Sequence, residues 1–152
     1  MHKLTILGRL PSLNEYSGQE RSGGWYKGSV MKQQASSDVA VYCMEQLRRV
    51  VIQEPVYIII CWYEKDNLRD ADNIAFGKKF IFDGLVARQV IRDDNRKNIL
   101  GFHDFVLLDP EHPRVEVYIY PGEEGIKKAA DISQLLLGVP TASLVSSVAP
   151  SQ

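Results

Sequence analysis

The spacing of apolar and polar positions predicts four strands before residue 121. Residues 56–63 are β-branched, aromatic or otherwise apolar on both faces, which is typical of a central strand covered on two sides. In residues 114–120, Val115, Val117 and Ile119 alternate with polar or aromatic positions, as in a half-buried strand. We also expect residues 4–8 and 98–108 to be extended.

The remaining pattern predicts helices and one long loop. Apolar residues recur every three or four positions over residues 29–51, which indicates a helix with Ser29 as its N-cap. A second helix is expected over 73–87, with Asp72 placed to cap it. Residues 9–28 are polar and rich in glycine, so we expect a loop there. A short amphipathic helix over 123–137 and a weakly ordered tail over 139–152 follow.

The order of these elements indicates an α+β (mixed α/β) fold, in which a mixed β-sheet is packed by two main helices. We expect one small domain over residues 1–121 and a C-terminal extension over 122–152. A length of 152 residues favours one domain, and 45% hydrophobic residues are ordinary for a globular protein. No apolar run reaches the ~18 residues that a bilayer-spanning helix needs, and no signal-peptide pattern opens the chain. We therefore expect a cytoplasmic protein with no membrane partner.

The cysteines and histidines exclude several classes of site. Cys43 and Cys61 lie in separate apolar segments, which favours buried free thiols over a disulfide scaffold. The three histidines are scattered and form no zinc-binding motif with the cysteines. The chain also lacks the glycine-rich phosphate loops, which argues against a nucleotide cofactor, and it lacks the G-x-S-x-G nucleophile motif.

Charge is concentrated in one segment. The net charge is only −1, which argues against nucleic-acid binding through bulk positive charge. Residues 65–97, however, hold most of the candidate chemistry. Asp70 and Asp72 lie two positions apart, so both carboxylates project to one side of an extended backbone. Such a pair suits Mg²⁺, which prefers oxygen ligands, and Asp93 or Asp94 would add a third carboxylate.

A purely structural interpretation of the same residues stays open. Asp72 would cap a helix, Asp70 would lie in a solvated loop, and residues 93–95 would form a turn. The lysines between them, Lys78 and Lys79, would then lie on a solvated helix face. With Mg²⁺ bound, the same carboxylates and a lysine would instead be equipped for phosphodiester hydrolysis.

These residues resemble the signature of the RusA family of Holliday junction resolvases, small Mg²⁺-dependent endonucleases often carried by phages. The family pattern R-D-x-D-N, K-x-x-F-D-x-L and D-D is matched here at residues 69–73, 79–85 and 93–94. Residues 10–16 (L-P-S-L-N-E-Y) and 113–117 (P-R-V-E-V) are similar to the family's first and last segments. The resemblance covers about residues 4–120.

The resemblance implies a catalytic set. Asp70, Asp72 and Asp94 match the family's catalytic carboxylates, which would hold Mg²⁺, with Mn²⁺ as a substitute. Lys79 matches the catalytic lysine. Between Asn73 and Lys79 this chain is three residues longer than the shorter family pattern, so Lys78 competes for that role. The two remaining aspartates of the motif would support the site without binding the metal: Asp83, which would orient the lysine, and Asp93.

The implied function is resolution of four-way DNA junctions by a homodimer in a bacterial cell, encoded by the host or by a phage. Phosphates would be contacted by basic residues, namely Lys27, Arg69, Lys78, Arg88, Arg92, Arg96 and Lys97. The segment with Trp25 and Tyr26 would close over DNA or stack on a base, or simply pack as a loop. Two alternatives stay open: a nuclease for flaps and other branched DNA, and a non-catalytic protein that binds branched DNA or a replication partner.

Overall fold

A four-stranded mixed sheet forms the centre of the structure. The computed structural model describes residues 1–137, without the side chains of Gly23, Ala129 and residues 132–137; the expected tail over 139–152 lies outside this range. The strands are β1 (His2–Leu7), β2 (Val56–Glu64), β3 (Ile99–Leu108) and β4 (Arg114–Pro121), in the order β1-β4-β2-β3. β2 is parallel to β3 and antiparallel to β4. The predicted α+β fold with a mixed sheet is confirmed.

The predicted central strand is also confirmed. β2 lies between β4 and β3 and is buried on both faces. Ile58, Ile60 and Trp62 belong to the main core, whereas Ile59 and Cys61 belong to a second cluster on the opposite face. This explains why the strand has no polar face: both sides of it are removed from water.

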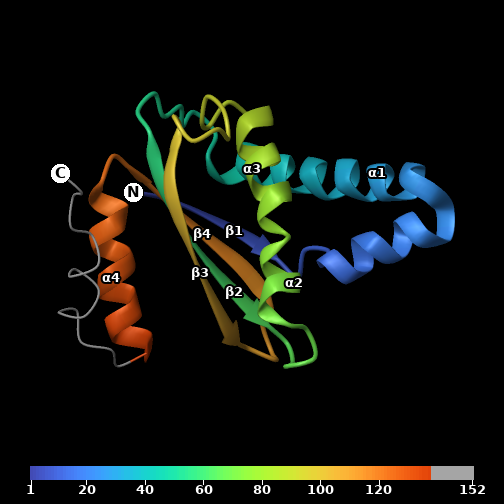
Figure 1. The fold of residues 1–152 in the computed structure, drawn as a ribbon. Helices are drawn as coiled ribbons and strands as arrows, with labels where there is room; N and C mark the ends of the chain where they lie inside the picture. Colours follow the sequence, from blue (N-terminus) through green and yellow to red (C-terminus); the bar gives the residue numbers. More distant parts are fainter. Residues whose placement is uncertain (138–152) are drawn as a thin grey trace, which may run out of the picture.

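Helices cover both faces of the sheet (Figure 1). The helices α1 (Leu13–Gln46), α2 (Ala71–Ala75) and α3 (Lys78–Ala87) pack on the side of the main core, and α4 (Glu124–Leu137) packs against β2 and β4 on the other. α1 and α3 approach closely at Gly84, where an added Cβ would lie 2.6 Å from Cγ1 of Val39. At Gly125 of α4, an added Cβ would lie 2.5 Å from Cβ of Tyr57. Small residues therefore permit both helix contacts.

The prediction of a loop over 9–28 is wrong from residue 13 onward. α1 begins at Leu13 rather than near Ser29, and it ends at Gln46 rather than 51. Ser12 is its N-cap: the Ser12 hydroxyl accepts from the backbone N–H of Glu15, whose carboxylate accepts from the N–H of Ser12 at 2.6 Å. Figure 1 shows α1 turning back on itself in its first half, and Gly24 there has a φ of 69°. The glycines serve this turn within a helical hairpin.

The single helix expected over 73–87 is divided in two. α2 has Asp70 as its N-cap, so the expected cap at Asp72 is wrong, and α3 begins only at Lys78. The break falls at Gly77, where an added Cβ would lie 3.1 Å from the Trp62 ring and 3.2 Å from Cβ of Leu10. A residue larger than glycine would therefore collide with these two side chains at the break. None of the helices in residues 1–137 has the length and apolar character needed to cross a membrane.

Candidate active site

Asp70 and Asp72, the first two aspartates of the motif, lie where the chain enters α2. Asp70 is the N-cap residue, yet its side chain makes no capping hydrogen bond. Asp72 lies in the first turn, where its carboxylate accepts a long hydrogen bond of 3.5 Å from the Asn73 amide. Both are exposed, and within residues 1–137 neither forms a salt bridge. These two carboxylates are therefore open to a ligand.

Lys79 joins two further aspartates of the motif. Its ammonium lies 2.6 Å from Oδ1 of Asp83, one turn along α3, and 3.5 Å from Oδ2 of Asp94, in the loop after α3. The predicted pairing of Lys79 with Asp83 is thus confirmed. The hydrogen bond to Asp83, reinforced by Asp94, raises the pKa of Lys79 above its ordinary value. Lys79 is consequently protonated at neutral pH. We use the name α2–α3 site for the four residues of the motif Asp70, Asp72, Lys79 and Asp94.

The neighbouring Lys78 is placed differently. Its ammonium donates to Oδ2 of Asp104 on β3 and lies 4.2 Å from the centre of the Phe102 ring. Oδ1 of the same Asp104 accepts from the Trp62 indole at 2.9 Å. The Lys78 side chain is 17% exposed and that of Lys79 is 46% exposed. The structure thus encloses Lys78 in a bridge between α3 and the sheet and leaves Lys79 accessible.

Sequence reasoning missed Asp104 as the partner of Lys78. One local signal for it exists, because Asp104 is the one carboxylate in a strand that is otherwise apolar apart from His103. A carboxylate in such a strand requires hydrogen-bond donors, and Trp62 on the neighbouring strand supplies one. The other donor, Lys78, is 26 positions away and is brought there by the fold.

Arg69 lies in a network that sequence reasoning did not anticipate. Its guanidinium donates to both oxygens of Glu64 at 3.3 Å and to the carbonyl of Leu10 at 2.8 Å, and it lies 3.4 Å from Glu15. Arg9 also contacts Glu64, at 3.3 Å. The Arg69 side chain is 13% exposed and that of Glu64 is 5% exposed. Arg69 therefore holds β2 to the start of α1, and this geometry gives no support to its expected contact with a phosphate.

The other predicted phosphate contacts lie at the surface. All are exposed and form no salt bridge within the described part of the chain: Lys27, Arg88, Arg92, Arg96 and Lys97. Four of these follow α3 in the loop that also carries Asp94, whereas Lys27 lies on α1. The turn expected over residues 93–95 lies slightly later in the chain: it begins at Asn95, whose carbonyl accepts from the N–H of Asn98 at 3.0 Å and whose side-chain oxygen accepts from the N–H of Lys97 at 2.9 Å.

The three expected metal ligands are not assembled into one cluster. Among residues 1–137, no group of three or more histidine, cysteine, aspartate or glutamate side chains is arranged to hold a metal ion. Asp94 instead contacts Lys79. The chemistry of Asp70 and Asp72 nevertheless suits Mg²⁺, which is commonly bound through one or two carboxylates and completes its octahedron with water.

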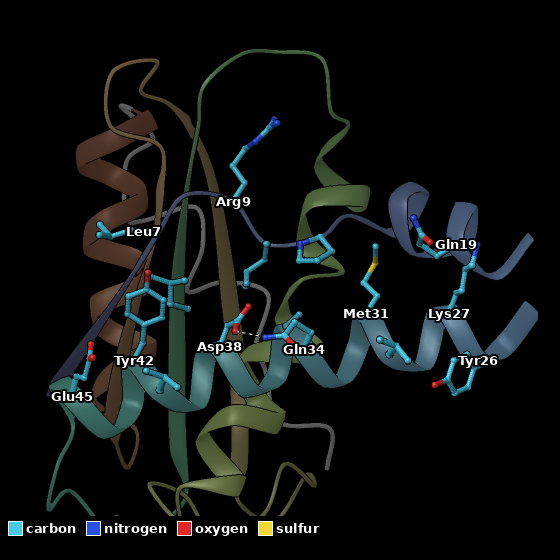
Figure 2. Close-up of a pocket in the computed structure, with 16 residues that line it drawn as sticks. Leu7, Arg9, Gln19, Tyr26, Lys27, Met31, Gln34, Asp38, Tyr42 and Glu45 are labelled. Atoms are coloured by element: carbon cyan, nitrogen blue, oxygen red, sulfur yellow. Dashed lines mark hydrogen bonds between the residues drawn. The ribbon is translucent and has the colours of Figure 1, made fainter. Parts of the chain in front are cut away.

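A large groove of the described surface lies elsewhere. A groove of about 1110 Å³ is bounded by β1, the segment after it and the two arms of α1 (Figure 2). Its walls include apolar side chains such as Leu10 and Met31, with Gln19 on the first arm of α1 and with Lys27 and Asp38, the latter bonded by Gln34, on the second. None of the motif's aspartates lines it. The side chains of the α2–α3 site are exposed at the surface, as suits a polymeric substrate better than a small molecule.

The sequence was also compared with known proteins. No protein-family model matches this chain, and no curated protein matches it. The side chains described above and the resemblance of the motif are therefore the basis on which a function is inferred.

Proposed function

We propose that this protein is a Mg²⁺-dependent, structure-selective endonuclease that resolves four-way DNA junctions. The observation that carries the proposal is the pair of exposed carboxylates of Asp70 and Asp72, which form no salt bridge within residues 1–137, followed in the same motif by the accessible Lys79 beside Asp94. A capping role would occupy one carboxylate of the pair, and no such hydrogen bond is made by Asp70 at the N-cap position. The motif that resembles the RusA family consists of these same residues.

In this proposal Asp70 and Asp72 hold Mg²⁺, with Asp94 as the third carboxylate. Once bound, the ion would lower the pKa of a coordinated water and offset negative charge on the attacked phosphate. Mn²⁺ would substitute, because it accepts the same carboxylate and water ligands. Asp94 lies 3.5 Å from the Lys79 ammonium, so that the charges of the α2–α3 site are partly balanced.

Lys79 is the lysine that acts on the phosphate. Its half-exposed ammonium can approach a DNA strand, whereas that of Lys78 is enclosed by Asp104 and Phe102. Asp83 fixes the Lys79 ammonium and keeps it protonated, as a group that stabilises developing negative charge requires. The cation would offset charge that builds on the phosphate or on its leaving oxygen.

The exposed basic residues after α3 would bind phosphates around the junction, close in sequence to Asp94. Resolution requires two opposed nicks, and a homodimer with twofold symmetry supplies two sites. Recombination and phage replication in the bacterial cytoplasm would supply the branched DNA substrate.

The test is cleavage of a labelled, immobile four-way junction, with linear duplex and flapped DNA beside it, in Mg²⁺ or in EDTA. Wild type is compared with Asp72→Asn, which removes a carboxylate of the site. The matched control is Asp38→Asn, which makes the same charge change on the exposed surface of α1. Paired nicks on the junction that require Mg²⁺, disappear in Asp72→Asn and persist in Asp38→Asn would support the proposal.

Other outcomes would reject it in informative ways. Preferential cutting of flaps would indicate a nuclease for other branched DNA. Tight junction binding without cutting in Mg²⁺ would indicate a binding protein. Loss of folding in Asp72→Asn, seen by circular dichroism, would return Asp72 to a structural role.

A further inference from the structure

A small cavity lies where α1 and α3 end. It has a volume of about 150 Å³, and it is lined by the last turn of α1, the segment that follows this helix, and Arg88 at the end of α3. The segments after the two helices run side by side: the N–H of Ile52 donates to the carbonyl of Val90 at 2.9 Å, and Ile52 pairs in parallel with Ile91. Packing therefore brings the two helix ends together at this cavity.

The charged residues that line this cavity are all arginines. They are Arg48, Arg49 and Arg88, and the other lining residues are apolar or cysteine. All three arginines are exposed, and within residues 1–137 none of them forms a salt bridge. In the groove between the arms of α1, by contrast, Asp38 and Glu45 accompany the basic residues. We call the cavity the arginine pocket. Since no carboxylate lines it, its positive charge favours an anion.

The charge of Arg88 reaches the inner wall of the arginine pocket. That wall includes Cys43, which is buried. Burial raises the pKa of the Cys43 thiol, and the positive charge of Arg88 partly opposes this effect, which places the guanidinium near the thiol. The wall also includes the apolar side chains of Leu47 and Val50. An apolar wall strengthens the attraction between a guanidinium and an anion, because the local dielectric constant is lower than in water.

Arg49 has an unusual backbone conformation. Its φ is 151°, a value that residues with a side chain rarely adopt. The turn that holds it is tight, because the carbonyl of Leu47 accepts from the N–H of Arg49 and from that of Val50, both at 2.9 Å. Glycine adopts a positive φ at little cost, so an arginine at this position lowers the stability of the fold. A strained residue of this kind is a reason to examine what its side chain does.

We propose that Arg48, Arg49 and Arg88 bind a phosphate group in the arginine pocket, separately from the α2–α3 site. A guanidinium donates two parallel N–H bonds to a phosphate or to a carboxylate. A planar carboxylate is filled by one such pair, whereas the tetrahedral oxygens of a phosphate accept from several guanidiniums at once. The volume of about 150 Å³ is smaller than the ~300 Å³ at which pockets for small molecules begin, so the pocket takes one small group.

Two sources of phosphate fit the arginine pocket. Lys79 lies in the first turn of α3 and Arg88 directly follows its last turn, roughly 14 Å along the helix. The backbone of a DNA bound at the α2–α3 site would therefore bring further phosphates near the pocket. Free phosphate in solution is the other source. The DNA source rests on the proposed function, whereas the phosphate site itself does not.

The test is a titration of the full chain with inorganic phosphate, against chloride at the same ionic strength, followed by the NMR signals of the arginine side chains. We expect saturable shifts of the pocket arginines at roughly millimolar phosphate. Arg49→Gly removes one guanidinium and relieves the backbone at this residue, so phosphate binding should weaken about tenfold while stability in urea is not lowered. Arg88→Gln should weaken phosphate binding in the same way. Arg21→Gln is the matched control, because it makes the same change at an exposed arginine of the first arm of α1.

A second measurement identifies the source of the phosphate. If DNA supplies it, Arg49→Gly should weaken the binding of a labelled four-way junction, measured by fluorescence anisotropy. Unchanged junction binding, together with weakened binding of inorganic phosphate, would assign the pocket to free phosphate.

Three results would overturn the proposal. The first is the absence of saturable shifts in wild type. The second is unchanged phosphate binding in Arg49→Gly and Arg88→Gln; if Arg88→Gln then lowers stability, Arg88 only offsets the negative end of α3. The third is an equal loss of phosphate binding in Arg21→Gln, which would indicate general surface charge. Since no cleavage is measured, a protein that binds phosphate here but cuts no DNA would reject the nuclease and leave the arginine pocket standing.

Discussion

Arg69 and Asp70 are neighbours in the sequence but belong to two different charged regions. The Arg69 network, formed with Arg9, Glu15 and Glu64, is buried at Arg69 and Glu64, and its charges are matched by partners within the chain. The α2–α3 site is exposed, and two of its carboxylates have no basic partner in residues 1–137. One region therefore stabilises the fold, and the other has charge left for a ligand.

The difference shows how a motif should be divided into roles. The segment R-D-x-D-N reads as one unit along the chain, yet its first residue faces the junction of β2 and α1 while its aspartates face solvent. Buried charges need matched partners, whereas surface charges are solvated and free to bind. The predictions below separate the two regions, from the largest expected effect to the smallest.

Removal of Glu64 should have the largest effect on stability. Glu64→Ala leaves the Arg69 guanidinium buried without its main partner, so we expect a loss of about 3 kcal/mol, near the lower limit for a broken buried pair because Arg9 is partly exposed. Urea unfolding measures this loss. Asp70→Asn, at the exposed site, should change the free energy of unfolding by less than about 0.5 kcal/mol. Equal losses of stability in Glu64→Ala and Asp70→Asn would contradict the distinction between a buried structural region and an exposed site.

The two adjacent lysines should separate activity from stability. Lys79→Met should lower the rate of junction cleavage by about 10²–10³ with little change in stability, since the lost cation acts on the phosphate. Lys78→Met should destabilise the protein by about 1–3 kcal/mol, because Asp104 loses its charged donor. Cleavage rates and thermal unfolding of both variants test this. The reverse pattern would make Lys78 the catalytic lysine.

The loop after α3, which carries Arg92, Arg96 and Lys97, should contribute a smaller, additive effect on DNA binding. Arg96→Ala should reduce the slope of log K against log salt for junction binding by about 1, as loss of one phosphate contact would. Lys65→Ala is a suitable control: Lys65 is exposed like Arg96, and it lies beside Asp66. Fluorescence anisotropy over a salt series measures both slopes. An unchanged slope in Arg96→Ala would remove this loop from the DNA contact.

The smallest effect concerns the thiols of the core. Burial raises the pKa of Cys43 from 9.0 to about 12 and that of Cys61 to about 11. As the pH rises, the thiols of the unfolded chain lose their protons before those of the folded protein. The contribution of these thiols to the free energy of unfolding is therefore complete below pH ~9 and declines as the pH rises toward 12. Cys43→Ala should make the free energy of unfolding decline less steeply with pH. At pH 8, a disulfide reagent should react with the native protein far more slowly than with the urea-unfolded chain.

Local patterns predicted most of the secondary structure because each depends on a few neighbouring side chains. The all-apolar run of β2 and the alternation of β4 follow directly from which faces are buried. The first arm of α1 escaped prediction because the segment is polar and has no apolar residues at helical spacing. Ser12 and Glu15 nevertheless form a capping box, which indicates the start of a helix. The division between α2 and α3 escaped prediction although Gly77 is a local signal for it, and the close approach of Trp62 and Leu10 to this glycine is visible only in the structure.

By itself, the sequence determined the strands, the central place of β2 and the acidic residues of the motif that resembles the RusA family. Only the tertiary structure decided which of those charges stay available. It placed Arg69 against Glu64, Lys78 against Asp104 and Gln46 over the edge of β1, across separations of 5, 26 and 41 positions. A charge is available to a ligand only if no partner has been folded against it, and partners so far along the chain are chosen by packing rather than by local sequence.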